Sequence, residues 1–164
     1  MTYITNWYIL LVAAVIPLFT GAIWYNAKVF GGALKKISGA NAEGEKGGHK
    51  PIIYILAYVL GLFLAVQMMT ITIHQMHVFS LFDGVANAKE PGSDLMILME
   101  KYGHNFRSFG HGAFHGILSS VFFVLPVVGI IALFEKKGGK YIFIHTGYWA
   151  ITMMLMGGLI CHMM

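Results

Sequence analysis

The chain has 164 residues, of which 57% are hydrophobic and 11% are charged. A water-soluble domain carries about 25% charged residues, so this composition argues against one, and the single cysteine excludes an internal disulfide or a CxxC metal site. The net charge of +4 does not indicate nucleic-acid binding, because the basic residues border apolar segments and therefore report membrane topology.

Four segments without a charged residue dominate the sequence. They cover residues 7–25, 52–73, 113–134 and 141–162, and each is about as long as the ~20 residues with which a helix crosses a hydrocarbon layer of ~30 Å. We therefore predict a single integral membrane domain over residues 1–164. Its fold would be an all-α bundle of four transmembrane helices at 6–36, 51–82, 107–135 and 140–163, with the lipid bilayer as its principal partner.

Prolines and polar residues predict the shape of each helix in chain order. The first helix should bend at Pro17, because proline removes one backbone hydrogen bond. The second should run unbroken until Asp83 and so project beyond the lipid, and the third should bend at Pro126. No basic n-region or small-residue cleavage site accompanies the first apolar run, so we expect a retained helix and not a removed signal peptide.

The central loop carries its own helix signal over residues 93–103. Ser93 is a typical N-cap residue, Gly103 is a typical stop, and apolar residues recur between them at helical spacing. This pattern predicts a short amphipathic helix that lies on the outer interface or on the bundle. A solvated loop helix that merely covers the top of the bundle fits the pattern equally well.

The distribution of basic residues predicts the orientation in a bacterial inner membrane. Eight of the 11 Lys and Arg residues lie in the first and third loops, and the other three lie in the central loop. Since basic residues near short loops stay on the cytoplasmic side, both termini and the central loop should face the periplasm. Trp7, Trp24 and Tyr25 stand at the ends of the first span and would anchor it at the two interfaces.

Small residues predict close contacts between helices. Where lipid provides no hydrophobic drive for association, glycines let two backbones approach each other. Packing within the chain and a dimer seam both explain such glycines. The candidates are Gly21, Gly112, Gly116, Gly157 and Gly158.

The histidines are concentrated at the outer level of the predicted bundle. His74 and His77 are three residues apart and His111 and His115 are four apart, so each pair presents two imidazoles on one helix face, while His162 ends the fourth helix. Structural hydrogen bonding without a ligand is the interpretation that such histidines favour. The alternatives are that these residues converge on a copper or zinc ion, that imidazoles from two helices ligate a haem iron, or that they form a proton-sensitive switch or relay.

Other side chains at a similar depth would extend such a site. Thiol and thioether groups would favour Cu(I) if they converged, and carboxylates could accept hydrogen bonds from the imidazole N–H groups. The candidates are Cys161, Met76, Met163 and Met164 for the first role and Asp83, Asp94 and Glu100 for the second.

Two segments of the sequence resemble a known family. Residues 21–31 (GAIWYNAKVFG) are similar to the GxxWYxxxxFG signature of domain-of-unknown-function family 1761, and residues 109–116 (FGHGAFHG) look like its glycine- and histidine-bearing entry to the third helix. Further landmarks follow in the family's order at 125–126, 132–135, 147–149 and 156–158. The resemblance spans nearly the whole chain; it implies a small four-helix inner-membrane protein of bacteria and carries over no catalytic residue.

The sequence contains none of the motifs GxxxxGK[ST], GxGxxG, GxSxG and HExxH. In a chain that is almost entirely bundle, this favours a non-enzymatic structural or accessory membrane component, either a homo-oligomer or a subunit of a larger complex. Metal or haem binding by the outer histidines is the alternative function. A small-solute transporter or channel that bends at its two prolines is a further alternative.

Overall fold

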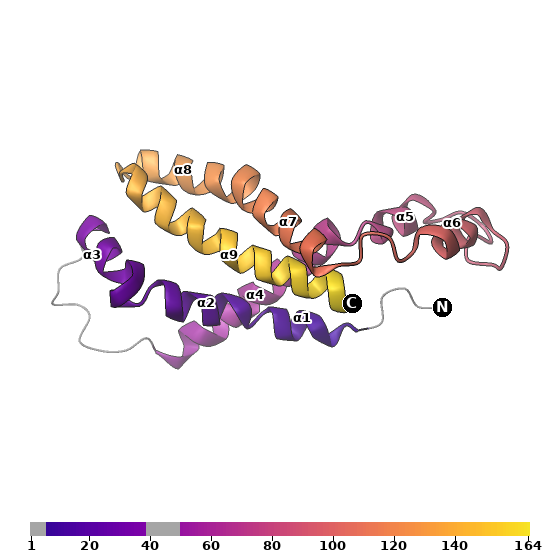
Figure 1. Ribbon diagram of the computed structural model, residues 1–164, viewed down its shortest axis with the longest axis horizontal. Coiled ribbons are helices and arrows are strands. Elements are labelled where there is room, and N and C mark those ends of the chain that lie inside the picture. The colour runs from indigo at the N-terminus through magenta and orange to yellow at the C-terminus, as the bar shows by residue number, and fades with distance from the viewer. Residues whose placement is uncertain (1–5, 39–49) are drawn as a thin grey trace.

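The computed structural model describes residues 6–38 and 50–164, and within them the chain forms helices and no strand (Figure 1). The predicted all-α class is confirmed for these residues. The helical elements in chain order are α1 (Tyr8–Ala13), α2 (Ile16–Trp24), the π-helical turn η1 (Ala27–Gly31), α3 (Gly32–Ser38), α4 (Pro51–Thr72), α5 (Gln75–Leu81), α6 (Asp94–Tyr102), α7 (Phe109–Ser119), the π-helical turn η2 (Ser120–Val124), α8 (Leu125–Phe134) and α9 (Gly139–Met163).

Three helical stretches of the described chain are long and apolar enough to cross a membrane. They are α4, the stretch Phe109–Phe134 that includes α7 and α8, and α9. The pair Tyr8–Trp24 and Ala27–Ile37 passes the same test together but is bent by 49°. The described residues therefore contain three candidate membrane spans, or four if the bent pair counts as one.

The first predicted helix is interrupted twice. α1 ends at Ala13, four residues before Pro17, whose ring would clash with the Ala13 carbonyl in a continuous helix. The second break follows Trp24, where Asn26 is extended and its side-chain oxygen accepts a hydrogen bond from Lys28 N at 3.0 Å. The prediction of a bend at Pro17 agrees with this geometry, but the continuous helix expected through Asn26 is wrong, because Asn26 acts as an N-cap and starts a new element.

The irregularity expected at Pro126 takes the form of the turn η2. Pro126 has no N–H to donate to the carbonyl of Phe122, and the helix widens by one residue per turn over Ser120–Val124 just before it. The widened turn still leaves α7 and α8 within one candidate span.

The second helix does not run unbroken as the sequence predicted, since it breaks after Thr72. Ile73 leaves helical geometry with φ −102° and ψ 89°, and Met76 N donates to Ile73 O. Residues 70–73 are all β-branched, and such side chains lose rotamer freedom in a helix. The Thr72 carbonyl, deprived of its helical partner, accepts a hydrogen bond from Cys161 Sγ at 3.5 Å. A contact from a distant helix therefore stabilises the break.

Helix α9 lies at the centre of the packing. Its residues Met153, Met156 and Ile160 share the main core with Ala65 and Met68 of α4. Helix α7 packs against α9 more extensively than any other pair of described helices does. This packing brings the start of α7 and the end of α4 to the same end of the bundle.

Residues 75–106, which we call the arm, project beyond the bundle along its long axis (Figure 1). Helix α6 lies within the segment 93–103 for which the sequence predicts a helix, and the Ser93 hydroxyl accepts from Met96 N at 3.3 Å. It packs on α5 and does not lie over the top of the bundle, which was one of the two alternatives that the sequence left open. The two helices enclose a small core of their own, made by Ala88, Leu95 and Met99 with Val78, Phe79 and Phe82.

Candidate metal centre

Three histidine side chains meet where α4, the arm and α7 join. Nε2 of His111 lies 2.9 Å from Nε2 of His74 and 3.1 Å from Nε2 of His115. One ring nitrogen from each of the three residues lies within 4.8 Å of the other two. None of the three side chains is buried, so the group is accessible from outside.

The first turns of α7 supply two of the three imidazoles. His111 and His115 are four residues apart, which places their side chains next to each other on one helix face. The Ser108 hydroxyl caps the helix by accepting from His111 N at 3.3 Å, and the Ser119 hydroxyl donates to the His115 carbonyl at 2.8 Å. The local sequence thus fixes the backbone that carries both rings.

The break after α4 presents the third imidazole. His74 follows the non-helical Ile73 and directly precedes α5, which lets its ring reach His111 on α7. The next side chain, Gln75, is buried and donates to the carbonyls of Tyr102 at 3.3 Å and Asn105 at 2.9 Å. These two hydrogen bonds tie α5 to the returning end of the arm and so hold His74 in place.

The shared nitrogen of His111 cannot satisfy both of its neighbours with one proton. A neutral imidazole has one N–H donor and one acceptor nitrogen, so Nε2 of His111 makes one full hydrogen bond at a time. Partial desolvation lowers the pKa of His74 below its usual value of 6.5, and the nearby His111 and His77 lower it further. His74 is therefore neutral near pH 7, which is the state that binds a metal ion.

The arrangement of the three nitrogens suits a small transition-metal ion. Zinc binds imidazole nitrogens at about 2.0–2.1 Å in a tetrahedron, which sets neighbouring nitrogens roughly 3.3 Å apart. The separations of 2.9 and 3.1 Å around His111 need only a small adjustment to reach that value. Three imidazoles without a thiolate suit Zn²⁺ or Cu²⁺ and leave a fourth position for water or another ligand.

A haem does not fit between these rings. Two axial histidines bind iron from opposite faces of the macrocycle, whereas the Nε2 atoms of His74 and His111 are in direct contact at 2.9 Å. The geometry therefore favours a bare ion over the haem that the sequence also allowed.

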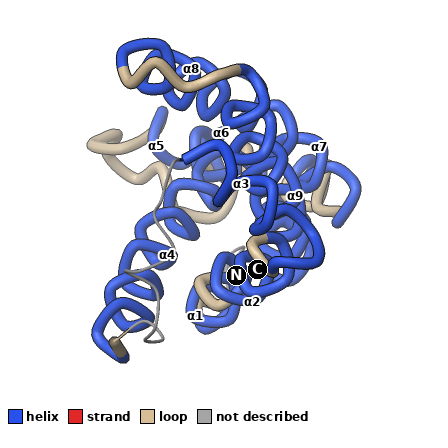
Figure 2. Tube along the Cα trace, turned by 90° about the vertical axis from the view of Figure 1, so that its left-hand side faces the viewer, coloured by secondary structure: helices blue, strands red, loops and turns tan. Residues whose placement is uncertain are grey.

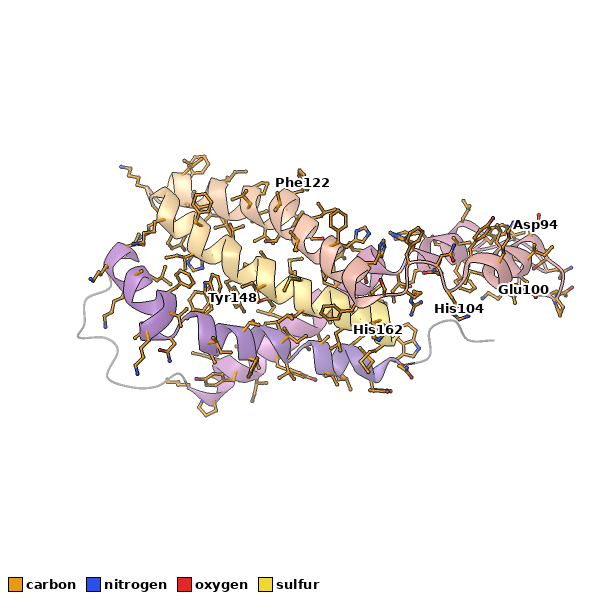
Figure 3. The ribbon with its side chains drawn as sticks, viewed as in Figure 1. Asp94, Glu100, His104, Phe122, Tyr148 and His162 are labelled. Carbon is orange, nitrogen blue, oxygen red and sulfur yellow. The ribbon has the colours of Figure 1, made fainter. Side chains whose placement is uncertain are left out.

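The other two predicted histidine ligands lie outside this group. His77 is exposed on α5. His162 is exposed at the C-terminal end of α9 (Figure 3). His74 is the N-cap residue of α5 and His77 lies in the first turn of that helix, but only the ring of His74 reaches the group formed with His111 and His115.

The predicted sulfur ligands are used elsewhere. Cys161 is buried, and its thiol donates to the carbonyls of Thr72 at 3.5 Å and Phe106 at 3.3 Å. Met76 and Met164 pack in the main core, and Met163 is 44% exposed at the end of α9. These sulfur atoms therefore do not join the three histidines in a donor set that would favour Cu(I).

The predicted carboxylates also stand apart from the histidines. Asp94 and Glu100 lie on the arm, away from the bundle (Figure 3), and Asp83 is exposed just after α5. Two polar residues that the sequence did not single out position the site instead. They are Gln75, described above, and Arg107, whose Nε donates to the Cys161 carbonyl at 3.1 Å. Both residues are polar and lie close in sequence to the histidines of an otherwise apolar chain. This position is the feature from which the sequence could have identified them.

The predicted packing glycines lie at contacts within the chain. A Cβ at Gly112 would overlap the backbone of Gly157, and a Cβ at Gly116 would overlap the backbone of Met153. These contacts favour packing within the chain over a dimer seam. Two further glycines face aromatic rings, Gly158 that of Phe109 and Gly21 that of Tyr148.

Two of the three predicted interface anchors make contacts inside the bundle. The indole N–H of Trp24 donates to the Ile144 carbonyl at 3.0 Å, and the Tyr25 hydroxyl lies 3.0 Å from Nδ1 of His145. Both contacts tie the end of α2 to α9. Trp7 is 55% exposed, whereas Trp24 and Tyr25 are half-buried, and the anchor role of the three residues stays a prediction.

Comparison with known proteins places the chain in a family. The family profile described as "Protein of unknown function (DUF1761)" matches residues 8–161, a range that includes all three clustered histidines. No curated protein matches the chain, and no solved structure matches it. The family match covers most of the chain and agrees with the resemblance of residues 21–31 and 109–116. The chain therefore belongs to the DUF1761 family of proteins of unknown function.

Proposed function

We propose that this chain is a non-enzymatic, multi-pass membrane protein that binds one Zn²⁺ or Cu²⁺ ion through His74, His111 and His115. The observation that carries the proposal is the convergence of three imidazole nitrogens, with Nε2 of His111 at 2.9 and 3.1 Å from the other two. An ion between the three rings accepts a lone pair from each nitrogen. A single proton shared among neutral rings satisfies only one of the two contacts of His111.

The proposed location is the bacterial cytoplasmic membrane, crossed four times. The fourth crossing uses the bent pair Tyr8–Trp24 and Ala27–Ile37 as one span. The excess of basic residues in the first and third loops would keep those loops in the cytoplasm. Both termini, the arm and the histidines would then face the periplasm, from which the ion would reach its site.

In this proposal the ion has a structural role. It joins His74, at the base of the arm, to two residues of α7, and so fixes the arm relative to the bundle. The arm exposes apolar side chains, among them Leu81 at 77% and Ile97 at 54%. Apolar residues on a projecting element suit contact with a partner subunit, which gives the chain an accessory role in a larger membrane assembly.

Metal titration of the purified protein tests the site. Protein extracted in mild detergent and stripped with a chelator should bind one equivalent of Zn²⁺ or Cu²⁺ per chain near pH 7, as measured by calorimetry and elemental analysis. His77→Ala removes a histidine close in sequence but outside the group, and it should keep the full stoichiometry. Binding well below one equivalent in the wild type, or loss of binding in His77→Ala, would refute the assignment.

The affinity should fall as the solution becomes acidic, because protons compete for the imidazoles. The pKa of His74 lies below 6.5, so this ligand stays available at a lower pH than an ordinary histidine does. In metal-free protein the same shift makes the fold less stable below about pH 6.5, since the unfolded chain binds the proton more readily. Equilibrium unfolding of stripped protein over a pH series checks this sign; greater stability at acidic pH would contradict it.

Blue-native electrophoresis tests the accessory role. Mild detergent extracts should give a band larger than the monomer, and Leu81→Ser should shift that band to the monomer because it removes an apolar contact of the arm. Leu133→Ser changes a leucine of similar exposure (72%) on α8 and should leave the larger band in place. A wild-type protein that runs strictly as a monomer would argue against the accessory role and leave the metal site untouched.

A further inference from the structure

A groove of about 650 Å³ opens between α2, α4 and α9, toward the end of α4 that is opposite to His74. Its volume falls in the range of about 300–1,000 Å³ that is typical of ligand pockets. Small residues make room for it, and those that line it are Gly21, Ala22, Ala57 and Gly61. None of the three clustered histidines lines the groove, so it is separate from the histidine group.

The groove is about as deep as one leaflet of a bilayer. Along α4 its lining runs from Ile53 to Leu64, a rise of about 16 Å at 1.5 Å per residue. The hydrocarbon core of a membrane is about 30 Å thick, so the groove extends from the surface at the start of α4 to roughly the midplane. A ligand that fills it is long, apolar and confined to one leaflet.

The end of the groove at the start of α4 is polar and lies beside lysines. Tyr25, Asn26 and Tyr54 line the groove at this end. Lys28 follows Asn26 closely in the chain, Lys50 is the N-cap residue of α4, and both are exposed. A ligand with a negatively charged head group would meet hydrogen-bonding groups and positive charge at the same place.

The first turns of α4 have open space around them. Residues 51–56 are exposed on every side of the helix, and Figure 2 shows this end of α4 leaning away from α2. Within a membrane the space between the two helices is filled by lipid chains. We propose that the groove binds one acyl chain of an anionic phospholipid from the lysine-bearing leaflet, with the phosphate near Lys28 and Lys50.

Native mass spectrometry of the delipidated protein tests this proposal. The probes are phosphatidylglycerol, phosphatidylethanolamine with identical acyl chains, and an isoprenoid quinone, each added at equal concentration. Phosphatidylglycerol should bind preferentially, by roughly fivefold for each lysine that contacts it. Lys28→Gln combined with Lys50→Gln should reduce its binding to the level of phosphatidylethanolamine while chain binding persists.

A second experiment fills the groove with a larger side chain. Ala57→Phe places a ring in the groove and should abolish the phosphatidylglycerol adduct. Val59→Phe adds a ring to the same helix outside the groove lining and should retain the adduct. Metal stoichiometry at the distant histidines reports that each variant is folded. Equal binding of all three lipids, preference for the quinone, an unchanged adduct in Ala57→Phe, or a protein dimer in place of the lipid would each overturn the proposal.

Discussion

Replacing His111 with alanine is expected to abolish metal binding, with an affinity loss of more than about 100-fold, since the loss of an outer partner of a metal ligand alone costs 10–100-fold. His111 is the central member of the group, and its Nε2 is the atom that both other imidazoles contact. Without it, His74 and His115 form only a two-ligand site. Competition with a chromophoric chelator measures the affinity directly.

Two comparisons make this result specific. His162→Ala removes another exposed histidine at the outer end of the chain and should bind metal like the wild type. Metal-free His111→Ala should also unfold at nearly the same denaturant concentration as the metal-free wild type, because the ring is only half-buried. Tight stoichiometric binding by His111→Ala would show that the ion uses other ligands.

Gly116→Ala is expected to disrupt the contact of α7 with α9. The added Cβ would overlap the carbonyl group of Met153 and would lie 2.7 Å from the nitrogen of Met154. These are backbone atoms that cannot rotate away, so the helices must separate, at a cost of about 1–3 kcal/mol or more. Thermal unfolding in detergent measures the loss, and metal affinity should fall too because His115 sits one residue from the displaced contact.

Gly110→Ala is the matched control on the same helix. A Cβ at Gly110 would meet no atom within 4 Å. Because Gly110 is the second residue of α7 and lies in its first turn, the gain in helix propensity is smaller than in a helix interior, and this variant should change the free energy of unfolding by less than about 0.5 kcal/mol. If both substitutions destabilised the protein equally, the effect would come from α7 itself and not from its contact with α9.

The features that depend on local periodicity could be predicted from the sequence. The all-α class follows from the charge-free segments, and the pairing of His111 with His115 follows from their spacing of one helical turn. The glycines at 112 and 116 lie on the next face of the same helix, where they meet α9. Short-range sterics determine each of these features, so one sequence is enough to infer them.

The choice of His74 over His77 depends on a contact that the sequence does not reveal. It requires the break at Ile73, where the freed Thr72 carbonyl is satisfied by a thiol 89 residues away. Trp24 shows the same limitation. Its position at a helix end predicts an interface anchor, but the hydrogen bond of its indole N–H to a carbonyl 120 residues away depends on the tertiary fold and has no local sequence signal.

The location of the sulfur atom of Cys161 makes the movement of the arm chemically detectable. Its thiol donates to the carbonyl of Thr72, where the chain enters the arm, and to that of Phe106, where the chain returns. A maleimide can reach this sulfur only while the two segments are parted. The chain has one cysteine. The rate at which Cys161 is alkylated therefore reports how often this junction opens, with no background from a second thiol.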